Sequence, residues 1–407
     1  MMMIMKLFNV ISVAELNKRI FSFLEENLQV IEIDLQDSIS YILAEDVYAV
    51  ENTPQFYKST VDGYAVIVQD TLGASESLPS VLKYEGSIEI GEFNKHTLKP
   101  NSCLYLNTGS MLPDGANGVV MIEQTEKIAA TNEVLVYKAL ANHENVSIPG
   151  TDITKQQLLF EKDQLIDERV KAVLASQGIS KIKVYEKLEA IIISSGNELV
   201  SYNSQIAMSQ IRDINVFLIK GLLEKYGIIV KETFLIKDDA VLYTDVLKNN
   251  NANLYITSGG SSQGREDYTY DVFHDLTNNV ICHGLAVKPG KPTIVATQDD
   301  RLFLGLPGNP VSAYLVLKKT LIATYLQITK QKLNIIKAQL EHNMAGAPGK
   351  DSTILVKIAK LRNIMIAKPV FYRSSNVLAL SSADGYFVIK AGLDGVDEGE
   401  EVEVVLF

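Results

Sequence analysis

Residues 181–328 alternate short apolar segments with amphipathic ones, and this alternation constrains the fold more than any other feature of the sequence. Alternating strands and helices form right-handed βαβ units, and these build a mostly parallel sheet that helices cover on both faces. The sequence therefore predicts an α/β domain over residues 181–329. Its predicted strands are 190–194, 228–236, 254–257, 293–296 and 302–306, and its predicted helices are 216–225, 240–248 and 311–326.

The flanking segments have a different character. Apolar residues recur at helical spacing in 12–27, and a short strand is expected at 30–33. Helices are also predicted at 37–47 and 165–177. Between them, short alternating runs separated by Gly, Pro, Asn and Asp indicate a β-rich module, and the chain after 329 is again β-like. The predicted domains are a discontinuous helical linker domain (1–47 and 146–180), an inserted β domain (48–145), the α/β domain (181–329) and a C-terminal β domain (330–407).

Charge and cysteine content exclude several classes of function. The 407 residues carry a net charge of −11, which argues against non-specific nucleic-acid binding. The two cysteines, Cys103 and Cys282, are too few for a disulfide framework or a Cys-rich zinc site, and their apolar surroundings predict burial. The N-terminal residues make a poor signal peptide, and no apolar run approaches the ~20 residues that span a membrane. We therefore expect a cytoplasmic protein with no membrane segment.

Three unusual loops follow predicted strands of the α/β domain. Ligands of open parallel sheets bind beyond the carboxyl ends of the strands, where such loops converge. Glycines with small hydroxyl residues leave backbone N–H groups uncovered, as in many anion sites. For each loop taken alone we favour a tight turn, but three at one sheet edge favour an anion or phosphate site. The loops are Ser195-Gly196-Asn197-Glu198, Ser258-Gly259-Gly260-Ser261-Ser262-Gln263-Gly264 and Pro307-Gly308-Asn309-Pro310.

Charged residues near these loops add to the hypothesis. Lys288-Pro289-Gly290-Lys291-Pro292 holds two lysines on a stiff backbone, either as a phosphate clamp or as a solvated pair in a turn. Glu198, Asp213 and Asp267 lie beside predicted strands or loops, and carboxylates together with substrate phosphates can hold Mg²⁺. The sequence contains neither a Walker A loop nor a GxGxxG or GxSxG motif, so these common nucleotide and hydrolase chemistries have no local support.

Taken together and in order, the motifs resemble those of the molybdopterin molybdenumtransferase family, the MoeA type that also occurs as the E domain of gephyrin. The resemblance runs from about residue 10 to the C-terminus, and its specificity lies in the ordered set. The matching motifs are Asp62-Gly63-Tyr64-Ala65, Thr108-Gly109, Pro113-Asp114-Gly115-Ala116, Gly150-Thr151-Asp152, Ser195-Gly196-Asn197-Glu198-Leu199, Ile211-Arg212-Asp213, Thr257-Ser258-Gly259-Gly260, Asp267-Tyr268, Lys288 to Pro292 and Leu306 to Ala313.

The resemblance implies a helical linker domain, an inserted β domain, a MogA-like α/β domain and a C-terminal β-barrel domain, assembled as a homodimer. It implies that adenylylated molybdopterin and molybdate react with Mg²⁺ present, in a cleft shared between subunits, to release AMP and form molybdenum cofactor. It also implies possible contact with a MogA-type adenylyltransferase. The implied catalytic residues are Asp62, Thr108, Asp152, Glu198 and Asp267, with Glu198 and Asp267 as metal ligands. The implied substrate-binding residues are Ser195, Gly196, Asp213, Ser258, Gly259, Gly260, Ser262, Gly264, Lys288, Lys291, Pro307, Gly308, Asn309 and Pro310.

Some positions depart from the family pattern. Ser147 stands where the family usually has an arginine, and Asn253 where it usually has an acidic residue. We expect such departures to affect turnover or metal choice more than the fold. Two alternatives to the transferase are a MoeA-like paralogue that binds pterin nucleotide as a carrier or scaffold, and a nucleotidyltransferase or pyrophosphatase of the MogA-like type.

Overall fold

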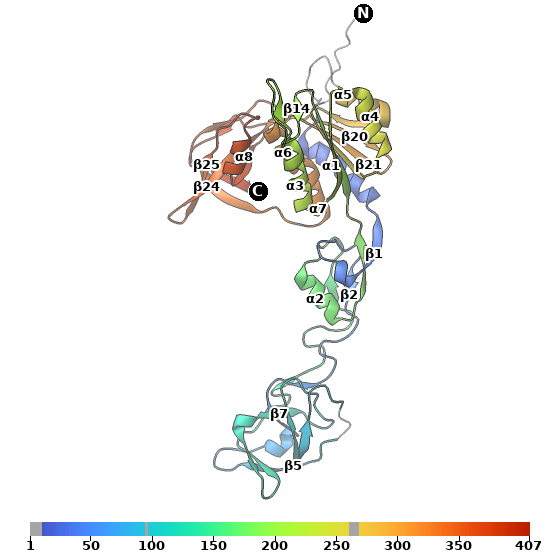
Figure 1. Ribbon diagram of the computed structural model, residues 1–407. Coiled ribbons are helices and arrows are strands. Elements are labelled where there is room, and N and C mark those ends of the chain that lie inside the picture. The colour runs from blue at the N-terminus through green and yellow to red at the C-terminus, as the bar shows by residue number, and fades with distance from the viewer. Residues whose placement is uncertain (1–9, 94–96, 260–267) are drawn as a thin grey trace, which may run out of the picture. The chain divides into compact units, whose positions relative to one another are not determined.

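The computed structural model describes residues 10–93, 97–259 and 268–407, and these divide into two compact units (Figure 1). The first unit comprises residues up to 45, 162–171 and 181–407, and the second comprises 46–161 and 172–180. The finer division into four domains stays a prediction. In the described part of the chain, no helix has the length and apolar character needed to cross a membrane.

The first unit contains the predicted α/β sheet. Its six strands lie in the order β16-β13-β17-β21-β20-β18, and the first four run parallel, as predicted. β20 and β18 are antiparallel to their neighbours. The strands are β13 (Glu189–Ser195), β16 (Ile229–Ile236), β17 (Leu254–Ser258), β18 (Val280–His283), β20 (Ile294–Gln298) and β21 (Arg301–Leu306), and the short β14 (Leu199–Val200) and β15 (Ile211–Arg212) pair beside them.

Apolar helices cover both faces of this sheet, because its central strands present buried side chains on each side. One face packs against α1 (Val13–Asn27), α3 (Asn215–Lys225) and the run formed by α6 (Pro310–Leu317), the π-helical turn η4 (Lys318–Ile322) and α7 (Ala323–Ile328). The other packs against α4 (Ala240–Asn249) and α5 (Tyr268–Thr277). Ser12 is the N-cap residue of α1. Its hydroxyl accepts a hydrogen bond from the Glu15 N–H at 3.1 Å, and such a cap contributes about 1 kcal/mol to stability.

The predicted helix at 37–47 is wrong. β1 (Val30–Asp34) pairs with β12 (Lys181–Tyr185) and is followed by a short 3-10 turn, η1 (Leu35–Asp37). Ser40 then adopts a φ of 65°, which interrupts any helix, and Ile42 and Leu43 form bridges to Leu165 and Val184. The apolar residues of this segment therefore bury themselves through extended backbone.

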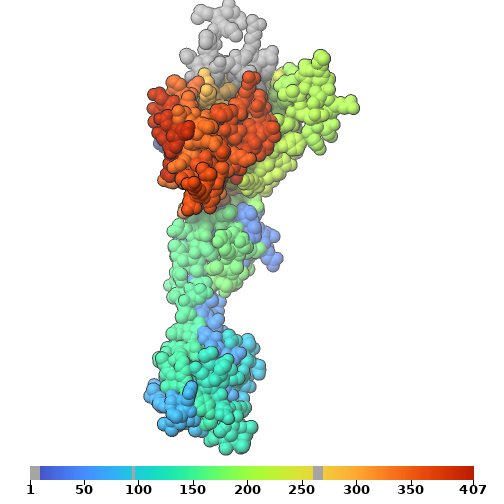
Figure 2. Space-filling view, turned by 90° about the vertical axis from the view of Figure 1, so that its left-hand side faces the viewer, coloured from blue at the N-terminus to red at the C-terminus, as the bar shows by residue number. Residues whose placement is uncertain are grey.

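The C-terminal strands form a closed five-stranded barrel, in the order β24-β25-β22-β28-β26 with β26 pairing back to β24. Figure 2 shows these orange and red residues gathered on one face of the first unit. The strands are β22 (Ile335–Leu340), β24 (Asp351–Leu361), β25 (Ile364–Pro369), β26 (Gly385–Ile389) and β28 (Glu401–Leu406), joined by β23 (Met344–Ala345), β27 (Gly395–Val396) and α8 (Val377–Ser382). β19 (Val287–Lys288) adds to the edge of β24.

The second unit is β-rich, as the sequence predicts. Its six-stranded sheet has the order β7-β4-β6-β5-β9-β8. The elements are β2 (Val47–Tyr48), β3 (Lys58–Ser59), β4 (Gly63–Val66), η2 (Val68–Thr71), β5 (Ser80–Ile88), β6 (Ser102–Leu106), β7 (Gly118–Met121), η3 (Ile122–Gln124), β8 (Thr125–Ile128), β9 (Glu133–Val136), β10 (Val146–Ser147) and β11 (Leu158–Phe160); α2 (Glu168–Ser176) has residues in both units. Cys103 here and Cys282 in the first unit are buried, as predicted, and burial raises the pKa of both thiols to about 12.

Candidate active site

The three loops singled out in the sequence converge at one edge of the parallel sheet. Ser194 of β13 pairs with Ser258 of β17, and Ser258 pairs with Leu306 of β21. Since these three strands are parallel, the loops that leave their carboxyl ends share that edge. The predicted convergence is confirmed for the described residues; Gly260, Ser262, Gly264 and Asp267 lie outside them.

Asp238 holds the first loop in place. The Ser195 hydroxyl donates to Asp238 Oδ1 at 2.6 Å, and the Asn197 N–H donates to Asp238 Oδ2 at 3.2 Å. The Gly196 N–H donates to the Ile236 carbonyl at 3.2 Å. Asp238 was missed in the sequence analysis, although its place two residues after β16 puts it at the same sheet edge. Each of its two oxygens accepts a bond from the loop, so Asp238 acts here by positioning Ser195 and Asn197.

The second and third loops pack backbone against backbone. Gly259 has a φ of +98°, and a Cβ built on it would lie 2.0 Å from the Ser195 carbonyl oxygen. A Cβ on Gly308 would lie 3.6 Å from the Gly259 Cα. Only glycine fits at position 259, because any side chain would overlap the first loop and would also need a left-handed backbone. The glycines therefore bring the backbones of all three loops together.

Asn215 joins two of these loops from the start of α3. Its Nδ2 donates to the Gly308 carbonyl at 2.8 Å and to the Ser258 hydroxyl at 3.3 Å. Asp213 Oδ1 accepts from the Asn215 N–H at 3.1 Å and so caps the helix. Within the described residues, Asn215 Oδ1 and Ser194 Oγ are buried without a hydrogen-bond partner. Unsatisfied buried polar atoms are rare in folded proteins, so their position at the sheet edge is consistent with a ligand there.

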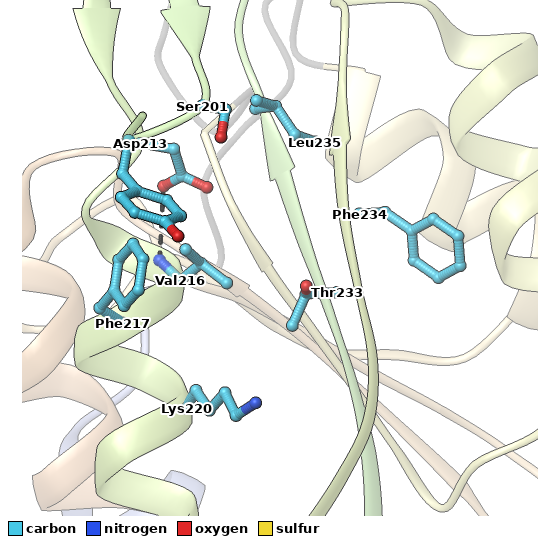
Figure 3. A pocket seen from close by; sticks show the side chains of 9 residues that line it. Ser201, Asp213, Val216, Phe217, Lys220, Thr233, Phe234 and Leu235 are labelled. Atoms are coloured by element: carbon cyan, nitrogen blue, oxygen red, sulfur yellow. Dashed lines mark hydrogen bonds between the residues drawn. The ribbon is translucent and has the colours of Figure 1, made fainter. Parts of the chain in front are cut away.

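A pocket of about 320 Å³ lies between α3 and β16, next to Asp213 (Figure 3). We call it the aromatic pocket, because Tyr202 and Phe217 meet edge to face at one side of it, with ring centroids 5.2 Å apart. The Asp213 carboxylate and the Lys220 side chain also line it. Its volume is within the range of small-molecule sites, and its aromatic faces suit a planar ring.

Lys288 lines a second pocket, of about 380 Å³, at the edge of the barrel. We call it the barrel pocket. Its polar lining residues include Lys288, Ser352, Thr353, Tyr372 and Ser374. The parallel pairing of β19 with β24 places Lys288 opposite Ser352. In the described part of the chain, its lining carries no carboxylate, and Ser352 Oγ is buried without a partner.

The Pro307–Pro310 turn connects the barrel pocket with the sheet edge. Asn309 precedes the first turn of α6, and Pro310 occupies that turn. The Val311 N–H donates to the carbonyl of Ser374, which lines the barrel pocket, at 3.1 Å. The Gly308 carbonyl faces Asn215 at the sheet edge. A ligand at either place would therefore contact residues held by the same turn.

Lys291 has a different environment from Lys288. Lys291 is half-buried, and its carbonyl accepts hydrogen bonds from the Leu285 N–H at 2.9 Å and the Thr293 N–H at 2.8 Å. Gly290, between the two lysines, packs tightly on α6, since a Cβ there would lie 2.4 Å from Val316 Cγ2. The sequence-predicted clamp thus places Lys288 at a pocket, while the binding role of Lys291 stays a prediction.

The second unit brings Asp62 and Thr108 together. Asp62 Oδ1 accepts from the Thr108 N–H at 2.6 Å and from the Thr108 hydroxyl at 2.9 Å. These two bonds lower the pKa of the Asp62 carboxyl below its ordinary value, with the backbone bond as the larger cause. Both residues are exposed. Asp62 thus presents a charged carboxylate with one oxygen bound to the loop.

Asp152 lies in an exposed turn of the same unit, where its N–H donates to the Thr53 carbonyl at 3.0 Å. Ser147, on β10, stands directly opposite Lys58 on β3. Its hydroxyl lies 3.2 Å from the Thr151 hydroxyl. Residues directly opposite each other on paired strands have neighbouring side chains. The β3–β10 pair therefore carries a positive charge at Lys58, next to the uncharged Ser147.

Comparisons with known proteins identify the family to which this chain belongs. Residues 11–178 match the family described as "MoeA N-terminal region (domain I and II)", 191–327 that described as "Probable molybdopterin binding domain", and 337–407 that described as "MoeA C-terminal region (domain IV)". A molybdopterin molybdenumtransferase of Staphylococcus epidermidis is 31% identical over 97% of this chain and 95% of that protein. The chain belongs to the MoeA family.

Two further relatives agree with this assignment. A molybdopterin molybdenumtransferase of Staphylococcus aureus is 29% identical over 98% of this chain and 96% of that protein. The crystal structure of a molybdopterin biosynthesis MoeA protein from Pyrococcus horikoshii has a TM-score of 0.84 and 31% identity, covering 98% of this chain and 99% of that one. The MogA-like α/β domain and the C-terminal β-barrel that the resemblance implied are therefore present.

Of the two expected Mg²⁺ ligands, Glu198 belongs to the described residues and Asp267 does not. In the residues that the structure describes, no three acidic, histidine or cysteine side chains gather as a metal site. Asp213 and Asp238 hold helix and loop N–H groups. The Glu198 carboxylate is exposed beside Gly196. One or two carboxylates plus substrate phosphates are the usual protein ligands of Mg²⁺, so Glu198 suits that role.

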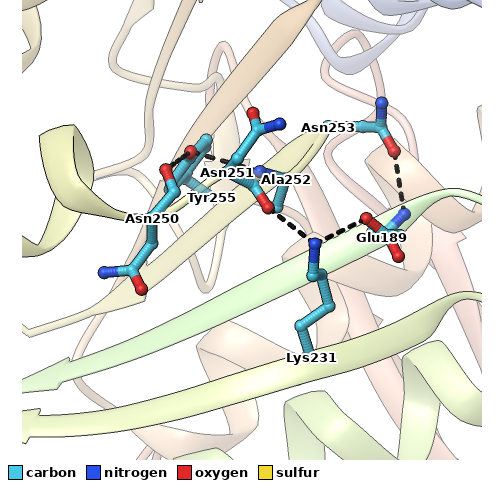
Figure 4. Close-up of polar contacts among 7 residues, drawn as sticks. All are labelled: Glu189, Lys231, Asn250, Asn251, Ala252, Asn253 and Tyr255. Atoms are coloured by element: carbon cyan, nitrogen blue, oxygen red, sulfur yellow. Dashed lines mark hydrogen bonds and ion pairs between the residues drawn. The ribbon is translucent and has the colours of Figure 1, made fainter.

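Asn253, one of the departures from the MoeA pattern, lies at the end of β17 opposite this site, and Figure 4 shows it beside Glu189. It immediately precedes β17, whose other end is Ser258. At about 3.3 Å per residue, roughly 16 Å of strand separates the two. Its Oδ1 accepts from the Glu189 N–H at 2.9 Å, beside Lys231, which bonds both the Glu189 carboxylate and the Asn251 carbonyl. Asn253 thus ties the start of β13 to the start of β17, and an effect of its missing charge on turnover stays a prediction.

We therefore expect Asn253→Asp to change the rate of AMP release less than about twofold, since either residue can accept the Glu189 N–H. Asn253→Ala should lower the free energy of unfolding by about 1 kcal/mol, because it leaves that N–H unpaired. Steady-state rates and denaturant titrations of both variants test this. A rate increase of tenfold or more in Asn253→Asp would contradict the structural role.

Proposed function

We propose that this protein inserts molybdate into adenylylated molybdopterin and releases AMP in an Mg²⁺-dependent reaction. Membership of the MoeA family makes it an enzyme of molybdenum cofactor biosynthesis. One observation carries the rest of the proposal: the Pro307–Pro310 turn joins a glycine-rich sheet edge to a pocket lined by a lysine and four hydroxyl residues. The reaction needs two anions side by side, and this arrangement offers two adjacent anion sites.

The sheet edge is suited to the phosphates of the substrate. Gly259 is half-buried against the first loop, and Ser258 and Asn215 place polar groups beside it. Backbone N–H groups of glycine loops bind phosphate without a counter-charge on the side chain. The Tyr202–Phe217 pair of the aromatic pocket offers faces for a planar ring of the same substrate.

The barrel pocket is suited to molybdate. Molybdate is a dianion, so its site needs donors, and a site lined by carboxylates would repel it. The lining residues Lys288, Ser352, Thr353 and Ser374 supply an ammonium and hydroxyl groups, while the Tyr372 hydroxyl donates to the Thr353 carbonyl. The unpartnered Ser352 hydroxyl supports a ligand here.

Glu198 and Asp267 would hold Mg²⁺, as the resemblance implies. When bound, the metal neutralises charge on the phosphates and eases the departure of AMP. Glu198 is exposed at the sheet edge, while Asp267 lies outside the described residues. An exposed carboxylate without Mg²⁺ would repel the phosphates, so the protein's affinity for adenylylated molybdopterin should depend on the metal.

Asp62, Thr108 and Asp152 complete the proposed machinery in a homodimer. They belong to the second unit, whereas the sheet edge and the barrel pocket belong to the first. We propose, from the resemblance, that the cleft takes them from the partner subunit. We also propose a cytoplasmic location and contact with a MogA-type adenylyltransferase that hands over the adenylylated substrate.

The decisive experiment incubates the purified protein with adenylylated molybdopterin and Mg²⁺, with and without molybdate, and measures AMP. Release that requires molybdate supports the transferase. Hydrolysis that does not require molybdate indicates a pyrophosphatase of the MogA-like type, and binding without release indicates a carrier or scaffold. Either of the last two results contradicts the proposed reaction.

Lys288→Ala should reduce molybdate-dependent AMP release by about 100-fold, because a charge-assisted contact with the dianion is lost. The release that remains should depend less on salt, since one screened charge is gone. Lys337→Ala is the matched control: Lys337 is an exposed barrel lysine paired with Glu401 at 2.8 Å, and its loss should be nearly silent. Equal rates for the two variants would argue against Lys288 as an anion ligand.

A further inference from the structure

Lys319 is a half-buried lysine whose ammonium contacts the wall of the barrel pocket. It lies in η4, the π-helical turn between α6 and α7, and its ammonium donates to Thr353 Oγ1 at 2.6 Å. Its carbonyl accepts from Asn17 Nδ2 of α1 at 2.9 Å. Single π turns inside α-helices are often found at functional sites. Thr353, the partner of the ammonium, is itself a lining residue of the barrel pocket.

Within the described residues, the Lys319 ammonium has no carboxylate at hydrogen-bond distance, and it donates to the neutral Thr353 hydroxyl. Asp351 attracts the ammonium and Lys390 repels it, and these two are already paired with each other at 3.3 Å. A buried ammonium is costly unless it is compensated. Burial accordingly lowers the pKa of Lys319 to about 8. An anion in the adjacent pocket would supply the missing compensation.

The Lys319 ammonium determines which way the Thr353 hydroxyl proton can point. An ammonium can only donate, so Thr353 Oγ1 must accept from Lys319, and the hydroxyl proton stays available for another acceptor. The Tyr372 hydroxyl donates to the Thr353 carbonyl at 3.0 Å and fixes the same residue from the other side. If Lys319 lost its proton, its lone pair could accept the Thr353 proton instead, and the donor would turn away from a ligand.

We propose that Lys319 is a positioning residue for oxyanion binding in the barrel pocket: its ammonium orients the Thr353 hydroxyl and adds a second positive charge to that of Lys288. This inference rests on the proposed function of that pocket. It predicts that an oxyanion and the Lys319 proton stabilise each other, so that anion binding near pH 8 takes up a proton. Above that pH, Lys319 is neutral in the free protein, and the affinity for the anion falls.

The test is titration of the 407-residue protein with inorganic molybdate by calorimetry, at pH 6.5, pH 8 and pH 9, in buffers of different ionisation enthalpy. The wild type should bind about tenfold more weakly at the higher pH and take up a proton near pH 8. Lys319→Met should bind about tenfold more weakly at low pH and show neither effect. Lys319→Arg should keep the low-pH affinity, because it stays charged, and should lose the proton uptake.

Lys318→Met is the matched control, because Lys318 is a buried lysine of the same π turn whose ammonium bonds the Tyr226 hydroxyl at 2.9 Å. It should leave molybdate binding unchanged. Thr353→Val keeps the charge of Lys319 but removes the link, and should weaken binding, while Thr353→Ser should restore it. Thermal unfolding of each variant confirms folding.

The outcomes separate this inference from the proposed function. If the wild type binds molybdate and Lys319→Met matches it in affinity, pH dependence and proton uptake, the inference is overturned and the proposed function stands. If Lys318→Met weakens binding as much as Lys319→Met, the effect comes from the π turn alone and the inference is also overturned. If the wild type neither binds molybdate nor releases AMP with it, both proposals fail.

Discussion

Gly259→Ala should abolish AMP release and lower the free energy of unfolding by about 2–4 kcal/mol. The new Cβ would lie 2.0 Å from the Ser195 carbonyl oxygen, on a residue whose φ is +98°. A left-handed backbone alone costs a residue with a Cβ about 1–2 kcal/mol, so the rest of the effect comes from separating the two loops. Denaturant titration measures the stability, and the AMP assay measures the activity.

Gly227→Ala is the control for the free-energy cost of a left-handed backbone at a residue with a Cβ. Gly227 has a φ of +78°, lies in the same unit, and a Cβ there would meet only the Ser40 carbonyl oxygen, at 3.7 Å. It should lose about 1 kcal/mol of stability and keep its activity, because ordinary contact distance leaves room for a methyl group. If both variants lost the same stability and kept full activity, the close approach of the loops would have no functional importance.

Asp62→Asn should reduce AMP release by about 100-fold and leave the fold intact. Asparagine can still accept from the Thr108 N–H and hydroxyl through Oδ1, so the loop stays in place, and only the charge is lost. The lowered pKa gives a second expectation. The carboxylate stays ionised down to pH values below its ordinary pKa, so Asp62 should cause no loss of activity between pH 5 and 9.

Mixing variants tests where Asp62 acts. An inactive Asp62→Asn protein and an inactive Lys288→Ala protein, mixed so that subunits exchange, should regain about a quarter of the wild-type rate if each cleft takes Asp62 from the partner subunit. Random pairing then gives that share of clefts with neither lesion. If Asp62→Asn were as active as the wild type, or if the mixture stayed inactive although heterodimers had formed, the proposed role in a shared cleft would be wrong.

Local sequence was sufficient to predict those strands whose hydrophobic pattern follows directly from their burial. The apolar segments that became β13, β17 and β21 are buried on both faces, so their continuous hydrophobicity marks them as parallel strands. The glycine and hydroxyl residues after them mark the sheet edge, because parallel strands end there together. Residues 37–47 misled the prediction, since their apolar residues bury through bridges to distant segments, which no local period reveals.

The sequence by itself determined the α/β sheet, its ligand edge and the family, because these depend on burial patterns and on an ordered set of motifs. Only the tertiary structure decided which polar groups meet. The pairing of β19 with β24 joins Lys288 to Ser352, and the π turn brings Lys319 to Thr353, across 34 residues. Asp238 holds Ser195 across 43 residues, while Asn253 is placed at the far end of its strand. Such contacts depend on where distant segments pack, and a hydrogen bond of 3 Å leaves no trace in the spacing of residues along the chain.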